Sequence, residues 1–132
     1  KEEDFIPVNI PGIPQIRMTR RMRGAYEMDD TEMHSHFEDS VGLFGDWRKN
    51  GPVYELPFRT LYCPEIKNLL SAGRCISVTD AMWDITRVIP VCAVSGEAAG
   101  TAAALGQDLS SLDIVRLQKT LRKNGVLLRE DA

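Results

Sequence analysis

Apolar residues follow one another almost without interruption from residue 91 to residue 105, directly after Pro90 and just before Gly106. A proline in the first turn and a glycine at the end are typical of an α-helix. The run is rich in Ala and Gly, and its only charged side chain is Glu97. We therefore predict a buried helix over residues 91–105.

A second helix is predicted near the end of the chain. Ser110 and Asp113 resemble the start of a capping box, and Asn124-Gly125 is a typical helix stop. A short helix is also expected over residues 81–85, with Thr79 or Asp80 as its cap, and a helical turn over residues 29–31. The apolar positions with helical spacing in the last helix are Ile114, Leu117 and Leu121.

Strand-like patterns occur in four segments of the chain. Polar and apolar residues alternate over residues 16–26, and residues 54–61 have strand-like composition with a proline that indicates an edge or a bulge. Residues 68–73 are predicted to form a buried strand that ends at a glycine turn, and residues 126–128 a short terminal strand. Glycine, asparagine and proline over residues 42–52 favour an irregular loop. The expected fold class is mixed α/β.

Composition limits the classes of protein that remain. The 132 residues carry a net charge of −3 and are 27% charged, which disfavours disorder and a dedicated nucleic-acid binder. Residues 88–107 have too little Leu, Ile and Phe for a membrane span, so no membrane partner is expected. Three cysteines without a CxxC pair indicate reduced thiols and a cytoplasmic location. Cys75 and Cys92 are predicted to be small buried side chains rather than redox partners.

Two clusters of polar residues are candidate sites. His34 and His36 lie among acidic residues, but no third histidine exists, so a solvated surface is favoured over a metal site. A dense basic cluster favours pairing with nearby carboxylates over an anion site for a substrate carboxylate or cofactor phosphate, and a nucleic-acid patch is less favoured still. The basic cluster consists of Arg17, Arg20, Arg21 and Arg23.

Three motifs in the same order resemble a known family. They are the segments 68–77 (NLLSAGRCIS), 86–92 (TRVIPVC) and 96–104 (GEAAGTAAA). In this order they resemble the C-terminal portion of a family of bacterial FAD-dependent oxidoreductases. The arginine-rich run near residues 16–24 and the end of the chain at residues 112–128 also look like that family, so the resemblance spans nearly the whole chain.

The resemblance implies a place for the chain in a larger flavoprotein. It implies the C-terminal fragment of a two-domain Rossmann-type enzyme that holds FAD, with residues 1–56 as the tail of the substrate domain and residues 57–132 as the returning part of the FAD domain. The glycine turn would approach the ribityl chain and phosphates, and the helix that begins at Pro90 would direct its amides, above all those of Val91 and Cys92, at the flavin. The cofactor-binding residues it implies are Ala72, Gly73, Arg74, Arg87, Pro90, Val91 and Cys92.

Several expectations about activity follow from the same resemblance. The chain begins at Lys1 without a methionine, which indicates an excised piece. Because the resemblance places the main half of the FAD site in the missing part, the piece is expected to be inactive and without bound FAD. Its main partner would be the N-terminal part of the same protein. Exposed apolar faces would also permit a homo-oligomer. The small-molecule substrate and the catalytic residues stay unknown. An ion pair of Arg87 with Asp84 or Asp80 is as well supported as a role beside the flavin. For the whole chain, the alternatives are a non-catalytic interaction module or, less favoured, a metal hydrolase.

Overall fold

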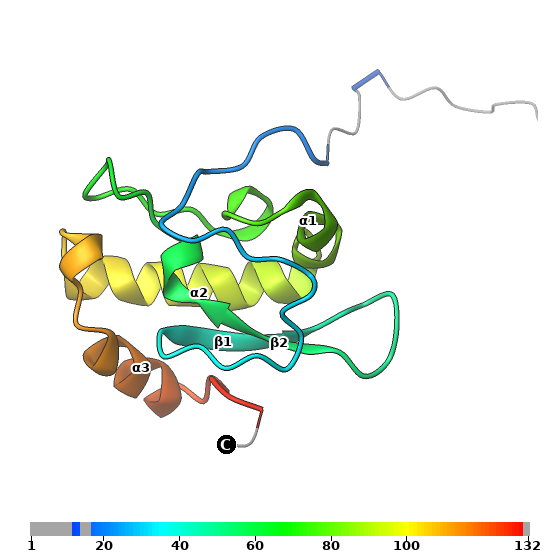
Figure 1. Cartoon of the computed structure of the whole chain (residues 1–132). Coiled ribbons are helices and arrows are strands. Elements are labelled where there is room, and N and C mark those ends of the chain that lie inside the picture. Colours follow the sequence, from blue (N-terminus) through cyan, green and yellow to red (C-terminus); the bar gives the residue numbers. More distant parts are fainter. Residues whose placement is uncertain (1–11, 14–16, 131–132) are drawn as a thin grey trace, which may run out of the picture.

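The computed structural model describes residues 12–13 and 17–130. Within them the chain forms an antiparallel hairpin of β1 (Ser40–Gly45) and β2 (Val53–Pro57), followed by three α-helices (Figure 1). The mixed α/β class is therefore confirmed for this part of the chain. The helices are α1 (Asp80–Thr86), α2 (Ile89–Leu105) and α3 (Ile114–Lys123), and short 3-10 helices occupy Phe58–Thr60, Gly73–Cys75 and Leu109–Ser111.

The predicted helices are confirmed, with small changes at their starts. Thr79 caps α1 by accepting a hydrogen bond from the Met82 amide, and Pro90 lies in the first turn of α2. Asp113 alone caps α3, because Ser110 belongs to the separate 3-10 helix before it. Residues 29–31 form a turn rather than the start of a helix.

The expected loop over residues 42–52 is wrong in its first part, which is strand β1. Gly42 in this strand serves packing rather than turning. A Cβ atom on Gly42 would lie 2.2 Å from Cγ1 of Val94, so the missing side chain lets α2 lie directly on the strand. The register of the hairpin pairs Leu43 with Glu55 and Phe44 with Tyr54, after an irregularity between Ser40 and Leu43.

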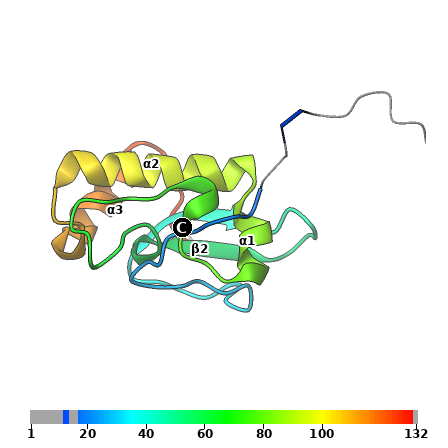
Figure 2. The same ribbon diagram turned by 90° about the horizontal axis from the view of Figure 1, so that it is seen from above.

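The hairpin forms the middle layer of the molecule. Figure 2 shows α2 along one face of the hairpin, while the segment coloured blue to cyan before β1 covers the other face. Helix α3 contacts both β1 and α2. Both faces of this two-stranded sheet are therefore covered. This explains why buried residues follow one another along β1 and β2 instead of alternating with exposed ones.

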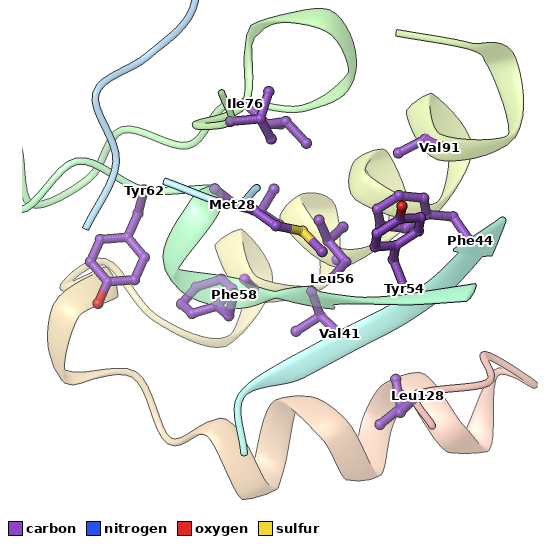
Figure 3. Close-up of a cluster of buried hydrophobic side chains, with 14 of the residues drawn as sticks. Met28, Val41, Phe44, Tyr54, Leu56, Phe58, Tyr62, Ile76, Val91 and Leu128 are labelled. Carbon is purple, nitrogen blue, oxygen red and sulfur yellow. The ribbon is translucent and has the colours of Figure 1, made fainter. Parts of the chain in front are cut away.

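One hydrophobic cluster joins these layers (Figure 3). It takes residues from before the hairpin, from both strands, from the helices and from the end of the chain. Members lie on both sides of the predicted boundary between residues 56 and 57, and that boundary stays a prediction about the complete protein. The labelled members are Met28, Val41, Phe44, Tyr54, Leu56, Phe58, Tyr62, Ile76, Val91 and Leu128.

Three predicted strands are wrong. Residues 17–26 run as irregular backbone whose amides bond singly to distant carbonyls, as Met22 does to Cys75 at 2.8 Å, and Ile16 lies outside the described residues. Residues 68–73 form only an isolated bridge between Leu70 and Tyr62, and residues 126–128 form no ladder. A strand needs a neighbouring strand for its hydrogen bonds, and the described part of the chain places none beside these segments.

No single helix in the described part of the chain has the length and apolar character needed to cross a membrane. Helices α1 and α2 meet such a requirement only when taken together, and a bend of 92° separates them.

Candidate functional site

The glycine turn expected from the sequence lies against the amino end of α2. Gly73 has a φ of +68°, a conformation that side chains disfavour, and it opens the 3-10 helix Gly73–Cys75. Its amide donates a 2.8 Å hydrogen bond to the hydroxyl of Ser95, which is buried inside α2 and donates in turn to the Val91 carbonyl at 2.7 Å. These bonds hold the turn at a fixed distance from the first turns of the helix.

A cleft opens beside this junction, and it has two lobes. The helix lobe, of about 450 Å³, lies at the amino end of α2. The loop lobe, of about 300 Å³, lies between the glycine turn and the segment after residue 16. Arg17 and Arg74 line both lobes, so we treat the two as one arginine cleft. Arg87, Ile89 and Cys92 complete the helix lobe, and Thr19, Arg20, Ala72 and Cys75 complete the loop lobe.

The arginine cleft thus brings most of the predicted cofactor-binding residues together. Four of them, distributed over 21 positions of sequence, line its walls, and Gly73 forms the turn between two of these four. Pro90 and Val91 are the exceptions: Pro90 lies exposed in the first turn of α2, and Val91 is buried beneath it. The four lining residues are Ala72, Arg74, Arg87 and Cys92.

The amino end of α2 is open. No side chain caps the helix, and Ile89 in its first turn is 84% exposed. The amides of Val91 and Cys92 were expected to point at a ligand. The Cys92 amide instead donates to the Val88 carbonyl at 3.0 Å, so it already has an acceptor within the chain. The positive end of the helix dipole therefore faces a space that the described residues do not fill.

Positive charge dominates the walls of the cleft. No acidic residue lines either lobe, and the described residues give the Arg74 guanidinium no carboxylate partner. Arg87 differs, because it forms an ion pair with Asp84 at 2.7 Å, one of the two partners expected for it. The cleft consequently suits an anionic or electron-rich group.

A second layer of contacts positions Arg87. Trp47, in the turn of the hairpin, donates its indole N–H to the Asp84 carbonyl at 3.0 Å, and Arg87 lies over the Trp47 ring at 5.9 Å. Arg48 also approaches the Asp84 carboxylate at 3.6 Å. The hairpin turn therefore helps to orient the Arg87 side chain, through Asp84 and the Trp47 ring. Sequence reasoning missed Trp47 and Arg48 because at least 36 positions of sequence separate them from Asp84, which both contact.

Ser95 was also missed, although the sequence carried a signal. It is a hydroxyl residue between Val94 and Gly96 in a helix whose other polar side chains are Glu97 and Thr101. A serine inside a helix commonly donates to the carbonyl four residues earlier, as Ser95 does, and it can accept a further bond when buried. Here that further bond fixes Gly73.

The basic cluster of the sequence divides into two parts. Arg21 pairs with Asp80 at 2.6 Å and with Glu27 at 3.5 Å, so the expected pairing with carboxylates is confirmed for this residue. Arg17 and Arg20 line the arginine cleft. The cluster therefore serves both a structural contact and the candidate site.

The two histidines lie at the surface. His34 contacts Glu130 at 2.8 Å and His36 contacts Glu55 at 3.2 Å, and both imidazoles are about half exposed. Within residues 12–13 and 17–130, no group of three or more His, Cys, Asp or Glu side chains is placed to hold a metal ion. These contacts explain the histidines as local partners of carboxylates.

The expectation of buried cysteines is wrong for Cys75, which is exposed, while Cys63 and Cys92 are half-buried. All three are free thiols. Cys75 lies at the end of the 3-10 helix Gly73–Cys75, where the tight turn directs it toward the loop lobe instead of the core.

An acid-sensitive contact supports the hairpin turn behind the site. Asp46 has a fully buried side chain, and the Arg48 side chain donates two hydrogen bonds of 2.9 Å to it. These bonds hold the pKa of the Asp46 carboxyl below its ordinary value of 3.8. A carboxyl with a lower pKa in the folded chain stabilises the fold above its unfolded pKa and loses that effect as the pH falls through the folded pKa.

We therefore predict that Asp46→Asn lowers the free energy of unfolding at pH 7 by about 1–3 kcal/mol. The difference from the wild type should shrink as the pH falls below about 4, where the wild-type carboxyl also becomes neutral. Urea unfolding at several pH values measures it, with Glu97→Gln on the exposed side of α2 as the control. A loss that is the same at pH 3 and pH 7 would contradict the prediction.

Comparison with known proteins identifies one family. A family model described as FAD dependent oxidoreductase matches residues 2–121. No curated protein and no solved structure matches the chain. The matched segment contains the glycine turn, α1, α2 and every residue that lines the arginine cleft.

Proposed function

The chain belongs to the FAD-dependent oxidoreductase family, and from this we propose that it is the C-terminal part of a longer Rossmann-type flavoenzyme whose flavin lies in the helix lobe of the arginine cleft. The observation that carries the proposal is the junction of Gly73 with the amino end of α2, which forms one wall of an open cleft. The chain contributes this wall and is inactive without the remainder of the enzyme.

The residues of the helix lobe fit a flavin. The turn at Gly73 has no side chain to obstruct a close approach of backbone to ligand, and its buried position is fixed through Ser95. The amino end of α2, without a side-chain cap, supplies free backbone donors. Arg74 and Arg87 add positive charge on either side.

The chemistry of such a site divides between cofactor and protein. Bound FAD supplies the ring that accepts a hydride from the substrate. In the complete enzyme the amino end of α2 and Arg87 would stabilise negative charge on the ring, because a helix N-terminus and a guanidinium are both positive. Asp84 and the Trp47 side of the hairpin turn hold Arg87 in place for this role.

The outer side of α2 supports the proposal that a further part of the enzyme covers it. The helix is apolar all round, which is typical of a helix buried on every side. In this chain one side of it is exposed, and that side carries only small or apolar residues apart from Glu97. We assign this side to contact with the N-terminal part of the same protein. Besides Glu97, the exposed residues of α2 are Ile89, Pro90, Ala93, Gly96, Gly100, Ala103 and Ala104.

The test is expression of the complete native reading frame that contains this sequence. We expect the upstream part to encode a strand, a GxGxxG turn and a helix, and the purified product to be yellow and reducible. The 132-residue chain, purified alone as the matched control, should be colourless. A complete product that binds no flavin would overturn the proposal and favour a non-catalytic interaction module.

A further inference from the structure

The loop lobe of the arginine cleft has a property that flavin binding does not use. Three guanidinium groups, those of Arg17, Arg20 and Arg74, line one space of about 300 Å³. Its other walls are Thr19, Ala72 and Cys75, so no carboxylate of the described residues lines the lobe. The like charges of Arg20 and Arg74 around one space repel each other, and their arrangement is stabilised when an anion enters.

We propose that the loop lobe binds an oxyanion group, namely a carboxylate of the substrate that the flavin oxidises. This inference rests on the proposed function, because it places the substrate beside the flavin of the helix lobe. Guanidinium groups present paired donors that match the two oxygens of a carboxylate. Arg74 lines both lobes, so an anion held in the loop lobe lies next to the space assigned to the ring.

Two structural features distinguish this lobe from an ordinary basic surface. Arg21, the neighbour of Arg20 in sequence, is neutralised by Asp80 at 2.6 Å and stacks over Trp83, whereas Arg74 has no carboxylate partner among the described residues. The backbone that carries Arg74 is also fixed. Its carbonyl accepts a 2.6 Å hydrogen bond from the Trp83 indole, and the Gly73 amide is bonded to Ser95. A fixed backbone reduces the ordering needed when a ligand binds.

The test uses the 132-residue chain and three small probes of similar size at constant ionic strength. Succinate presents carboxylates, succinamide presents neutral amides of the same shape, and pyrophosphate presents phosphate oxygens. Shifts of the Ala72 and Cys75 amide signals in nuclear magnetic resonance spectra report binding in the lobe. We expect succinate to shift them in a saturable way and succinamide to leave them unchanged.

Arg74→Gln should weaken succinate binding about tenfold or more, because a charge-assisted bidentate contact is lost. Arg74→Lys keeps the charge without the paired donors, and it should fall between Arg74→Gln and the wild type. Arg122→Gln, at the exposed end of α3, is the matched control and should bind as the wild type does. An unchanged spectrum elsewhere in each variant establishes that it folds.

Three results would overturn the assignment. They are equal shifts by succinate and succinamide, succinate binding that does not depend on Arg74, and a preference for pyrophosphate of about tenfold, which would assign the lobe to a cofactor phosphate. Flavin retention by the complete product is measured separately. Loss of flavin with Arg74-dependent succinate binding would refute only the proposed function, whereas bound flavin without succinate binding would refute only this inference.

Discussion

Replacing Gly73 by valine is expected to lower the free energy of unfolding of the chain by about 2–4 kcal/mol, since it combines backbone strain with overpacking. At a φ of +68° a β-branched residue is strained. In addition, a Cβ atom there would lie 3.1 Å from the Cys92 sulfur, at the buried junction with α2. The same change should prevent the complete flavoprotein from retaining FAD, because it moves the glycine turn away from the helix.

Two other glycines separate these causes. Gly125 also has a positive φ, +90°, but a Cβ atom on it would meet nothing within 4 Å, so Gly125→Ala should cost only backbone strain, about 1–2 kcal/mol. Gly96 lies on the exposed side of α2 in ordinary helical conformation, and Gly96→Ala should raise stability by about 0.5–1 kcal/mol. Urea unfolding measures the free energy of unfolding of all three variants. If Gly73→Val lowers it by no more than Gly125→Ala does, the role of the Cys92 contact is refuted.

Leu56→Ala is expected to lower the free energy of unfolding by about 2–5 kcal/mol. Leu56 is 0% exposed in β2, within the cluster that joins the hairpin to the helices (Figure 3). Truncation removes apolar contacts and leaves a cavity that the surrounding layers cannot fully close. Small domains are stable by only about 5–15 kcal/mol, so the variant should unfold at a much lower urea concentration.

Leu127→Ala provides the matched control for this change. Leu127 is 62% exposed near the end of the described chain, and the same truncation there should alter stability by less than about 0.5 kcal/mol. A cost below about 1 kcal/mol for Leu56→Ala would mean that β2 is not packed between two layers as described.

Local signals in the sequence were sufficient for the helices. The proline of α2, the Thr79 and Asp113 caps and the stop at Gly125 all act within one or two turns of the residues that they affect. The strands were predicted less well, because a strand depends on a partner that is distant in the chain. Residues 68–73 have the composition of a buried strand, yet their backbone forms only one isolated bridge.

The candidate site shows the same division. Motif resemblance, together with the chemistry of glycine and arginine, is sufficient to identify Gly73, Arg74, Arg87 and Cys92 as candidates. It does not reveal that Arg17 joins them, that Ser95 holds the turn, or that Trp47 supports Arg87. Those contacts link residues that are far apart in the chain, and no local pattern encodes such a pairing.

The sequence by itself determined the family, the mixed α/β class and the ends of the helices, since each depends on short motifs, caps and turn residues. Only the tertiary structure decided that the segment after residue 16 is irregular, that Gly42 belongs to a strand beneath α2, and that one group of arginines divides between an ion pair and a cleft. The physical reason is that burial and charge pairing depend on distances in space, which arise only when all layers pack together.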